Sequence, residues 1–437
     1  MNNLDNKISK VRGLLALSPI AVFLVFYLFV SIIVNDFYKM PISVAFIIAS
    51  IWAVIITNKL PLKDRINIFS HGAANTNILY MIWIFILAGA FASLAKEIGA
   101  IDATVNLTLK FLPPQFLIPG IFLATCFISL SIGTSVGTIV SLTPFAVELA
   151  SSLGENVPFI VAVVIGGSFF GDNLSFISDT TIAATRCLGC KMNDKFKANI
   201  WIAIPASILV LTLYILLGQT ENYVITAQTS ASYWLVIPYL LVIISAIVGI
   251  NVLIVLTVGI ISSIIIGLIF SSHSLLDMCG FMGNGISDMG DLIVITLLAA
   301  GMLELIKYNG GIKFLMKWLT NHISGTRGAQ ATIAALVSIV NVCTANNTIA
   351  IITVGDISKQ ISNQFKLDPR KTASILDTCS CIIQCIIPYG AQTLLAAGLA
   401  KVSPAAFTPY LYYAWALALM VILSIIFKFP KSHQIKQ

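Results

Sequence analysis

The sequence predicts an all-α protein that crosses a membrane many times and is built from two related halves. Hydrophobic residues make up 58% of the 437 residues and charged residues only 10%, whereas soluble domains carry about 25% charged residues. Apolar runs of about 20 residues, the length that spans a bilayer as a helix, recur along the whole chain. Clusters of small and polar residues interrupt these runs at corresponding places in each half, which points to a transporter-like architecture.

Basic residues lie at the ends of the apolar runs, where their positions indicate how the chain is oriented in the membrane. This placement accounts for the net charge of +7, so no nucleic-acid partner is expected. By the positive-inside rule, Lys7, Lys10 and Arg12 place the N-terminus in the cytoplasm, and the basic stretch 428–436 places the C-terminus on the same side. The first run has no cleavage pattern and is taken as a retained span. These features predict a multi-pass protein in the lipid bilayer of the bacterial cytoplasmic membrane.

Hydropathy and the alternation of basic loops predict about ten spans and two re-entrant hairpins. In the first half, spans are expected at residues 14–34, 41–57, 78–95, 157–185 and 200–217, with a hairpin at 116–150. In the second half, spans are expected at 233–249, 252–270, 292–306, 372–400 and 409–427, with a hairpin at 329–361. Basic cytoplasmic loops are expected at 59–65 and 186–197, and an external loop at 271–288. Residues 14–218 then form the first repeat, 219–232 an external linker and 233–428 the second repeat.

The two halves also align in sequence. The segment LAGAFASLAKEIGAI, which starts at Leu87, aligns with LAAGMLELIKYNGGI, which starts at Leu298, at a constant offset of 211 residues. The first segment is expected to run outward and the second inward, so the halves form inverted repeats, as in many secondary transporters. Chance similarity between apolar segments is the alternative, but the shared order of span, hairpin, broken helix and span argues against it.

Each half has one interrupted hairpin and one interrupted span. GTSVGT (133–138) and CTANNT (343–348) are expected to be hairpin tips, and GDNLSFISD (171–179) and PYGAQT (388–393) to be helix breaks. Irregular backbone survives inside a membrane only where it is buried in protein or lines a cavity. Unwound carbonyls, hydroxyls and amide oxygens are suited to Na⁺. Close helix packing at small residues would explain glycines such as Gly167 and Gly171, but not the polar residues beside them.

Asp172 and Asp179 place two carboxylates in the first helix break. A charged side chain at the bilayer centre costs about 2.5–3.5 kcal/mol even on the most lenient scale, so a cation, a proton or a water-filled cavity must offset the cost. On an unbroken helix the two residues would lie about 10.5 Å apart on one face, and a break allows a closer approach. Protons and cations compete for neighbouring carboxylates, as H⁺/Na⁺ exchange requires. We therefore expect Na⁺ at Asp172 and Asp179.

The expected site residues form three groups. The cation- and proton-binding group is Asp172, Asn173, Ser175, Ser178, Asp179 and Thr180. The hairpin tips contribute Gly133, Thr134, Ser135, Thr344, Asn346, Asn347 and Thr348. The second-half break contributes Asp377, Pro388, Gly390, Gln392 and Thr393. Because this second break has an acid before it but only Gln392 and Thr393 after it, the first half is expected to dominate ion binding.

The interruption motifs resemble those of one transporter family. GDNLSFISDTT (171–181) resembles the GDNLSPxSDTT signature of the NhaC-type Na⁺/H⁺ antiporters, which belong to the ion-transporter superfamily. GTSVGT resembles their GTSWGT, and TANNTIAI (344–351) resembles their second-half motif. The likeness covers about residues 75–400 and implies inverted repeats with hairpins and broken helices, Na⁺ and H⁺ as transported ions, and no cofactor. Phe176 stands where the family usually has Pro and Val136 where it has Trp, departures that concern the substrate more than the fold.

Two transport functions remain open from the sequence. The leading hypothesis is Na⁺/H⁺ antiport by alternating access; the alternative is Na⁺- or H⁺-coupled transport of a small organic acid or amino acid, held by the Asn, Thr and Gln side chains of the second half. An intramembrane aspartyl protease is disfavoured, because FFGD (169–172) lacks the first Gly of a GxGD motif. No enzymatic activity is expected. The sequence leaves the stoichiometry and the oligomeric state open, a homodimer included.

Overall fold

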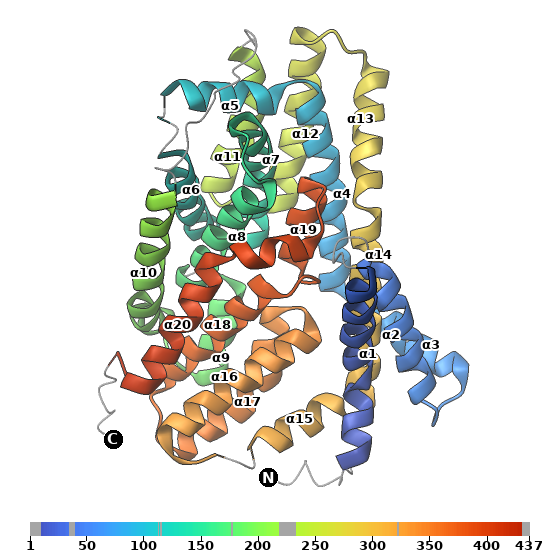
Figure 1. Ribbon diagram of the computed structural model, residues 1–437, viewed down its shortest axis with the longest axis vertical. Coiled ribbons are helices and arrows are strands. Elements are labelled where there is room, and N and C mark those ends of the chain that lie inside the picture. The colour runs from blue at the N-terminus through green and yellow to red at the C-terminus, as the bar shows by residue number, and fades with distance from the viewer. Residues whose placement is uncertain are drawn as a thin grey trace.

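The computed structural model describes residues 10–34, 40–111, 113, 116–175, 178–217, 233–320 and 323–430. These residues are helical nearly throughout and form an elongated bundle (Figure 1). The first half contains α1 (Lys10–Val34), α2 (Ile42–Ile56), α3 (Leu62–Ala73), α4 (Thr76–Glu97), α5 (Ala100–Phe111), α6 (Leu117–Ile132), α7 (Ser135–Leu153), α8 (Val157–Leu174), α9 (Asp179–Leu188) and α10 (Met192–Leu217). The second half contains η2 (Tyr233–Val236), α11 (Ile237–Ile247), α12 (Val252–Phe270), α13 (Leu275–Asp288), α14 (Gly290–Tyr308), α15 (Gly311–Thr320), α16 (Gly325–Thr344), α17 (Asn347–Gln364), α18 (Pro369–Ile386), α19 (Ala391–Ala400), η3 (Pro404–Tyr410) and α20 (Tyr412–Phe427).

The prediction of an all-helical, multi-span membrane protein is confirmed. In the described part of the chain, eight helices are long and apolar enough to cross a membrane, and nine if η3 and α20, bent by 56° at their junction, are counted as one span. One of these is α7, which forms an arm of the first hairpin, while α2 and the η2–α11 segment are apolar but shorter. The total of ten spans therefore depends on whether these two shorter segments also cross.

Corresponding helices of the two halves keep a nearly constant spacing along the chain. The first residues of α7 and α17, of α8 and α18, and of α9 and α19 are all 212 residues apart (135 and 347, 157 and 369, 179 and 391). A tertiary hydrogen bond repeats at the same spacing: the Ser129 hydroxyl donates to the Ser168 carbonyl, and the Asn341 amide donates to the Ser380 carbonyl. The halves therefore repeat in packing as well as in helix order. The expected linker lies outside the described residues, so the repeat boundaries stay a prediction.

The hairpins of the two halves lie toward opposite ends of the bundle. In Figure 1, α5, α6 and α7 lie in the upper part of the molecule, whereas α15, α16 and α17 lie in the lower part. The turn between α6 and α7 and the turn between α16 and α17 line one cavity together with the breaks α8–α9 and α18–α19. Gly133 ends α6 with φ 74°, a left-handed conformation that glycine adopts without a steric penalty. Ala345 takes the corresponding turn of the second half with φ 48°.

The loop expected at residues 271–288 is wrong, because α13 covers most of it and continues into α14. The two helices together form a 34-residue candidate span, Leu275–Tyr308. The glycines that suggested a loop serve close packing instead, since a Cβ on Gly285 would lie 2.1 Å from the carbonyl oxygen of Gly89 on α4. The basic segment at 59–65 likewise leads into α3, which packs along α14. Backbone contact between small residues, rather than turn propensity, determines these elements.

We expect Gly285→Ala to lower the thermal unfolding temperature of the detergent-purified protein. Its methyl group would collide with the backbone of α4, and overpacking of this kind costs about 1–3 kcal/mol. Gly283→Ala is the matched control on the same helix, because a Cβ there meets no heavy atom within 4 Å and alanine favours a helix over glycine by about 1 kcal/mol. Equal unfolding temperatures for the two variants would contradict the packing of α13 on α4.

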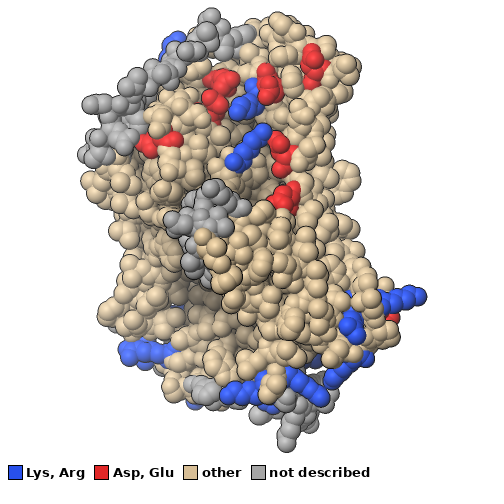
Figure 2. Space-filling view, turned by 45° about the vertical axis from the view of Figure 1, so that its right-hand side comes forward, with Lys and Arg blue, Asp and Glu red and all other residues tan. Residues whose placement is uncertain are grey.

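Charged side chains are distributed unevenly between the two ends of the molecule. On the face drawn in Figure 2, most lysine and arginine side chains follow the lower rim and a few lie in the upper half, where most aspartates and glutamates are found. The start of α1 and the end of α20 both lie at the lower end (Figure 1). The lower end is therefore the more basic end of the visible face.

Candidate functional site

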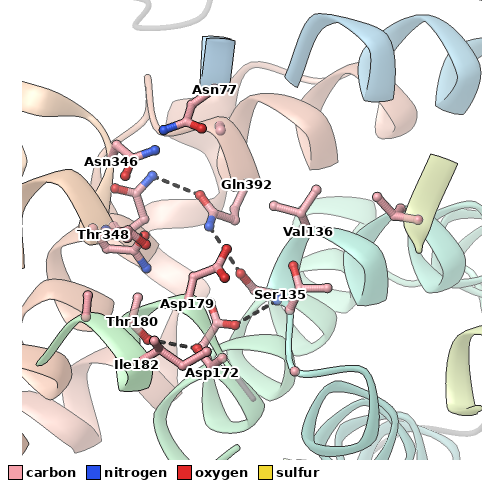
Figure 3. Close-up of a pocket in the computed structure, with 18 of the residues that line it drawn as sticks. Asn77, Ser135, Val136, Asp172, Asp179, Thr180, Ile182, Asn346, Thr348 and Gln392 are labelled. Atoms are coloured by element: carbon pink, nitrogen blue, oxygen red, sulfur yellow. Dashed lines mark hydrogen bonds between the residues drawn. The ribbon is translucent and has the colours of Figure 1, made fainter. Parts of the chain in front are cut away.

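A polar cavity of about 680 Å³ lies where the two hairpin turns meet the two helix breaks (Figure 3). It collects residues from both halves that are far apart in sequence. The expected site residues that line it are Gly133, Thr134, Ser135, Asp172, Ser178, Asp179, Thr180, Asn346, Asn347, Thr348 and Gln392. The cavity therefore brings together most of the interruption residues that the sequence singled out.

Asp172 lies in the last turn of α8 and is the most enclosed acid of the cavity, with 5% of its surface exposed. Its Oδ1 accepts a hydrogen bond of 2.8 Å from the backbone N–H of Ser135, the first residue of α7. A helix N-terminus carries a partial positive charge, so the hairpin turn holds the carboxylate in place. The carboxylate keeps a face toward the cavity, where a cation or proton has access to it.

Asp179 begins α9 on the other side of the break and is exposed within the cavity. Figure 3 shows its carboxylate pointing into the same space as that of Asp172. Beside it, the hydroxyl groups of Ser178 and Thr180 share a hydrogen bond of 2.8 Å. The break in the helix thus lets two carboxylates from successive helices face one cavity, together with hydroxyl oxygens.

Side-chain amides connect the two halves across the cavity. The Gln392 side-chain amide donates to the Ser135 hydroxyl at 3.1 Å. The Gln384 side-chain amide donates to Gln392 Oε1 at 2.8 Å and to the backbone carbonyl of Ala345 at 3.0 Å. Together with the bond from Ser135 to Asp172, these contacts form a continuous chain from the second hairpin turn to the acid (Figure 3).

Gln384 was missed in the sequence because the repeat offset changes along the chain. The helices α5 and α15 begin 211 residues apart (100 and 311), but α7 and α17 begin 212 apart (135 and 347). With the later offset, Gln384 is the counterpart of Asp172, and the counterpart of Asp179 is Ala391. Each of the two acids of the first helix break therefore corresponds to an uncharged residue in the second half.

Several expected site residues do not line the cavity. These are Asn173, Ser175, Thr344, Asp377, Pro388, Gly390 and Thr393. Ser175 caps the end of α8, and its N–H donates to the Gly171 carbonyl at 2.7 Å. Thr344 donates to the Asn346 carbonyl within the hairpin turn at 3.1 Å. Gly390 lies against Gln384, since a Cβ there would be 3.0 Å from its amide nitrogen. These residues lie at the turns and breaks but outside the cavity lining, so their part in ion binding stays a prediction.

Asn173 and Asp377 belong instead to a buried cluster around Lys195. Lys195 was expected in a basic cytoplasmic loop, but it lies in the first turn of α10 with 1% of its side chain exposed. Its Nζ lies 2.6 Å from Asp377 Oδ2 and donates to the Asn173 carbonyl at 2.7 Å. Asn199 also donates to Asp377 Oδ2, at 3.0 Å. Asp377 is therefore neutralised by a lysine of the other half and does not face the cavity.

Other cavity residues had no strong sequence signal. Asn77 and Tyr80 line it from the start of α4, and Asn251 lines it as the residue that caps α12. Arg186, which was expected in the same basic loop as Lys195, lines the cavity from α9. A polar residue at the start of an apolar run was the available clue for Asn77 and Asn251. Of the two departures from the family motifs, Val136 lines the cavity, and Phe176 lies outside the described residues.

Comparisons with known proteins match the chain over nearly its whole length. A model of the Na⁺/H⁺ antiporter family matches residues 6–219 and, a second time, residues 218–429. The Na⁺/H⁺ antiporter NhaC of Bacillus subtilis strain 168 is 26% identical over 382 residues, which cover 79% of this chain and 83% of that protein. The malate-2H⁺/Na⁺-lactate antiporter of the same strain is 20% identical over 427 residues, 90% of this chain and 91% of that protein. The arginine/ornithine antiporter ArcD of Halobacterium salinarum is 21% identical over 387 residues, 80% of each chain.

Proposed function

Because the chain belongs to the Na⁺/H⁺ antiporter family, we propose that it exchanges Na⁺ for H⁺ across the bacterial cytoplasmic membrane by alternating access. It is a secondary transporter and not an enzyme. The observation that carries the proposal is the meeting of Asp172 and Asp179 in one polar cavity at a helix break. Na⁺ and protons would occupy these two carboxylates in turn, because binding of one disfavours the other.

The proposed membrane disposition has ten spans, with α6–α7 and α16–α17 as re-entrant hairpins that enter from opposite sides. This disposition makes the two halves inverted repeats, with the more basic lower end of Figure 2 and both ends of the chain in the cytoplasm. It is supported by the opposite placement of the hairpins in Figure 1. It also places the broken backbone at a protein-lined cavity, which is where irregular backbone is tolerated inside a membrane.

Oxygen atoms from both sides of the first break would complete the Na⁺ shell. Ser178 and Thr180 supply hydroxyl oxygens beside the carboxylates, and Thr134 and Ser135 supply them from the first hairpin turn. The hydrogen-bonded amides of Gln384 and Gln392 end on Ser135. A movement of the second break would therefore shift Ser135, whose N–H holds the Asp172 carboxylate. Alternating access then requires movement of the turns relative to the breaks.

The experiment that tests the proposal is ion exchange in vesicles that contain the purified protein. An inward Na⁺ gradient is expected to alkalinise the lumen, because H⁺ leaves the vesicle as Na⁺ enters, and a trapped pH dye reads this change. A choline gradient of the same size should leave the pH unchanged. If Na⁺ and choline give the same trace, and no organic solute restores a Na⁺ response, the antiport proposal is wrong.

A second candidate is exchange of Na⁺ or H⁺ for a small organic anion, such as an organic acid or an amino acid. The cavity of about 680 Å³ lies within the range of about 300–1,000 Å³ that is usual for small-molecule sites and far exceeds what a bare ion needs. The N-termini of α7, α9, α17 and α19 all lie at its lining, and helix N-termini favour anions. Arg186 adds a guanidinium, a group suited to a carboxylate.

If an organic carboxylate is carried, Arg186→Gln should weaken its binding by about 10- to 150-fold. In the wild type we expect a rise in thermal unfolding temperature with the carried carboxylate from a panel of organic acids and amino acids. The variant should lose about 1.5–3 kcal/mol of binding free energy, the value of a hydrogen bond to a charged group, while any shift with NaCl stays unchanged. Arg327→Gln, at the start of α16 and outside the cavity lining, is the control. A panel without any stabilising acid would remove this candidate.

A further inference from the structure

The ammonium group of Lys195 occupies a cage of oxygen atoms that is separate from the cavity. Its Nζ lies 2.6 Å from Asp377 Oδ2, 2.7 Å from the Asn173 carbonyl oxygen and 2.7 Å from the Thr181 hydroxyl oxygen. Lysine has three N–H donors, so these three oxygens match them fully. Neither Lys195 nor Asp377 lines the cavity, and both are at most 1% exposed.

The oxygens of this cage are ligands that a hard cation would take. The Asn173 carbonyl belongs to the last turn of α8, the partially negative end of a half-helix. The Thr181 hydroxyl comes from the first turn of α9, and the carboxylate comes from α18 of the other half. Ends of broken helices, unwound carbonyls and carboxylates are the groups that coordinate Na⁺ in many transporters. The cage therefore spans the first helix break and joins it to the second half.

The corresponding place in the second half has no such pair. At the offset of 212 residues, Lys195 corresponds to Phe407 and Asp377 corresponds to Ile165, and both of these are fully buried apolar residues. The counterpart of Thr181 is Thr393, whose buried hydroxyl has no hydrogen-bond partner. There η3, a 3-10 helix where the first half has the start of α10, packs on α8 with apolar residues, so packing at this place in a repeat does not require the ion pair. Replacement of a buried pair by apolar residues is often neutral or stabilising, so its presence in one half calls for another reason.

We propose that the Lys195 ammonium is a resident cation that fills a second cation site, formed by Asn173, Thr181 and Asp377. Tethered to the chain, this cation cannot leave, and it keeps Asp377 from binding a transported ion. The exchangeable ion is then confined to the site at Asp172 and Asp179. The inference goes beyond the proposed exchange activity, because it concerns a site outside the cavity and predicts how many Na⁺ ions one chain holds.

The test counts bound ²²Na⁺ per chain at saturation in the purified full-length protein. Wild type is expected to bind one Na⁺, and Lys195→Ala is expected to bind one more, in the vacated cage. Lys195→Arg is the matched control, because it keeps a cation in the cage and should add no Na⁺. Lys195→Ala combined with Asp377→Asn removes the carboxylate as well and should return the count to that of the wild type.

Repeating the count in an Asp172→Asn background separates this inference from the proposed function. In that background the count is expected to fall to zero, and adding Lys195→Ala should raise it to one. If the protein with Asp172 intact binds no Na⁺ but its Lys195→Ala variant binds one, the Na⁺ site at Asp172 is wrong and the resident cation stands. If Lys195→Ala binds no more Na⁺ than wild type in either background, the resident cation is wrong.

Thermal unfolding keeps the inference testable if Lys195→Ala is unstable. Its unfolding temperature should rise with NaCl more steeply than that of the wild type, and choline chloride should not substitute. Failure of Lys195→Ala to fold at any NaCl concentration, while the double variant folds, would overturn the inference, because a cage that accepts Na⁺ would be rescued. If neither variant folds, the wild-type count decides, and two Na⁺ per chain would overturn it.

Discussion

Asp172→Asn is expected to reduce Na⁺-driven proton movement in vesicles by about a hundredfold, which corresponds to ~2.7 kcal/mol. The substitution keeps the size of the side chain and one oxygen that can accept the Ser135 N–H. It removes the negative charge that a cation needs in a cavity shielded from water, where electrostatic interactions are stronger than in bulk solvent. The measurement is the initial rate of luminal pH change after a Na⁺ jump, at matched protein density.

Asp64→Asn is the control for Asp172→Asn. Asp64 is an exposed residue of α3 and lies outside the cavity lining, so its loss should leave the rate within about twofold of the wild type, in keeping with the small free-energy effect of surface substitutions. Both variants should show the elution profile and unfolding temperature of the wild type. Undiminished exchange by Asp172→Asn would refute the role of this carboxylate, whatever the control does.

Asp377→Asn is expected to destabilise the protein strongly, by about 3–5 kcal/mol. It leaves the Lys195 ammonium buried with the Asn173 carbonyl and the Thr181 hydroxyl but without its counter-charge. The measurement is denaturant or thermal unfolding in detergent. Added NaCl should not rescue this variant, because the cage then has an excess of positive charge, in contrast to the expected rescue of Lys195→Ala.

The exposed pair between Lys401 and Asp288 is a control of similar geometry. Its N–O distance is 2.7 Å, but the two side chains are 72% and 39% exposed, so Asp288→Asn should cost only about 0–1 kcal/mol. Similar losses for Asp377→Asn and Asp288→Asn would show that burial does not control the energetics of the Lys195 cluster. The comparison isolates the effect of desolvation, because both variants replace an aspartate in a single ion pair.

The helix plan was largely predictable because it depends on local sequence. Runs of apolar residues long enough to span a bilayer can do little but form helices, since each backbone polar group must be bonded within its segment. Polar interruptions at 133–138, 171–179, 343–348 and 388–393 cannot lie against lipid, so they predicted the turns and breaks. The cavity lined by Asp172, Ser135 and Gln392 follows from those interruptions.

The errors arose where a residue's environment depends on a partner far along the chain. Gly285 was assigned to a loop because its contact with Gly89 is invisible in the sequence. Lys195 was assigned to a cytoplasmic loop because lysine near a span end usually meets water, and only Asp377, 182 residues later, makes its burial tolerable. Gln384 was overlooked because one extra residue between the aligned segments shifts the register.

The sequence by itself determined the membrane-spanning helical class, the two related halves and the acidic helix break at Asp172 and Asp179. Those properties follow from hydrophobic length, periodic repetition and the cost of placing charge in hydrocarbon, all of which are local or additive along the chain. Only the tertiary structure decided which polar groups share the cavity and which neutralise one another. That choice depends on distances between helices of different halves, such as the 2.6 Å between Lys195 and Asp377, because electrostatic interactions and hydrogen bonds act over short range in space.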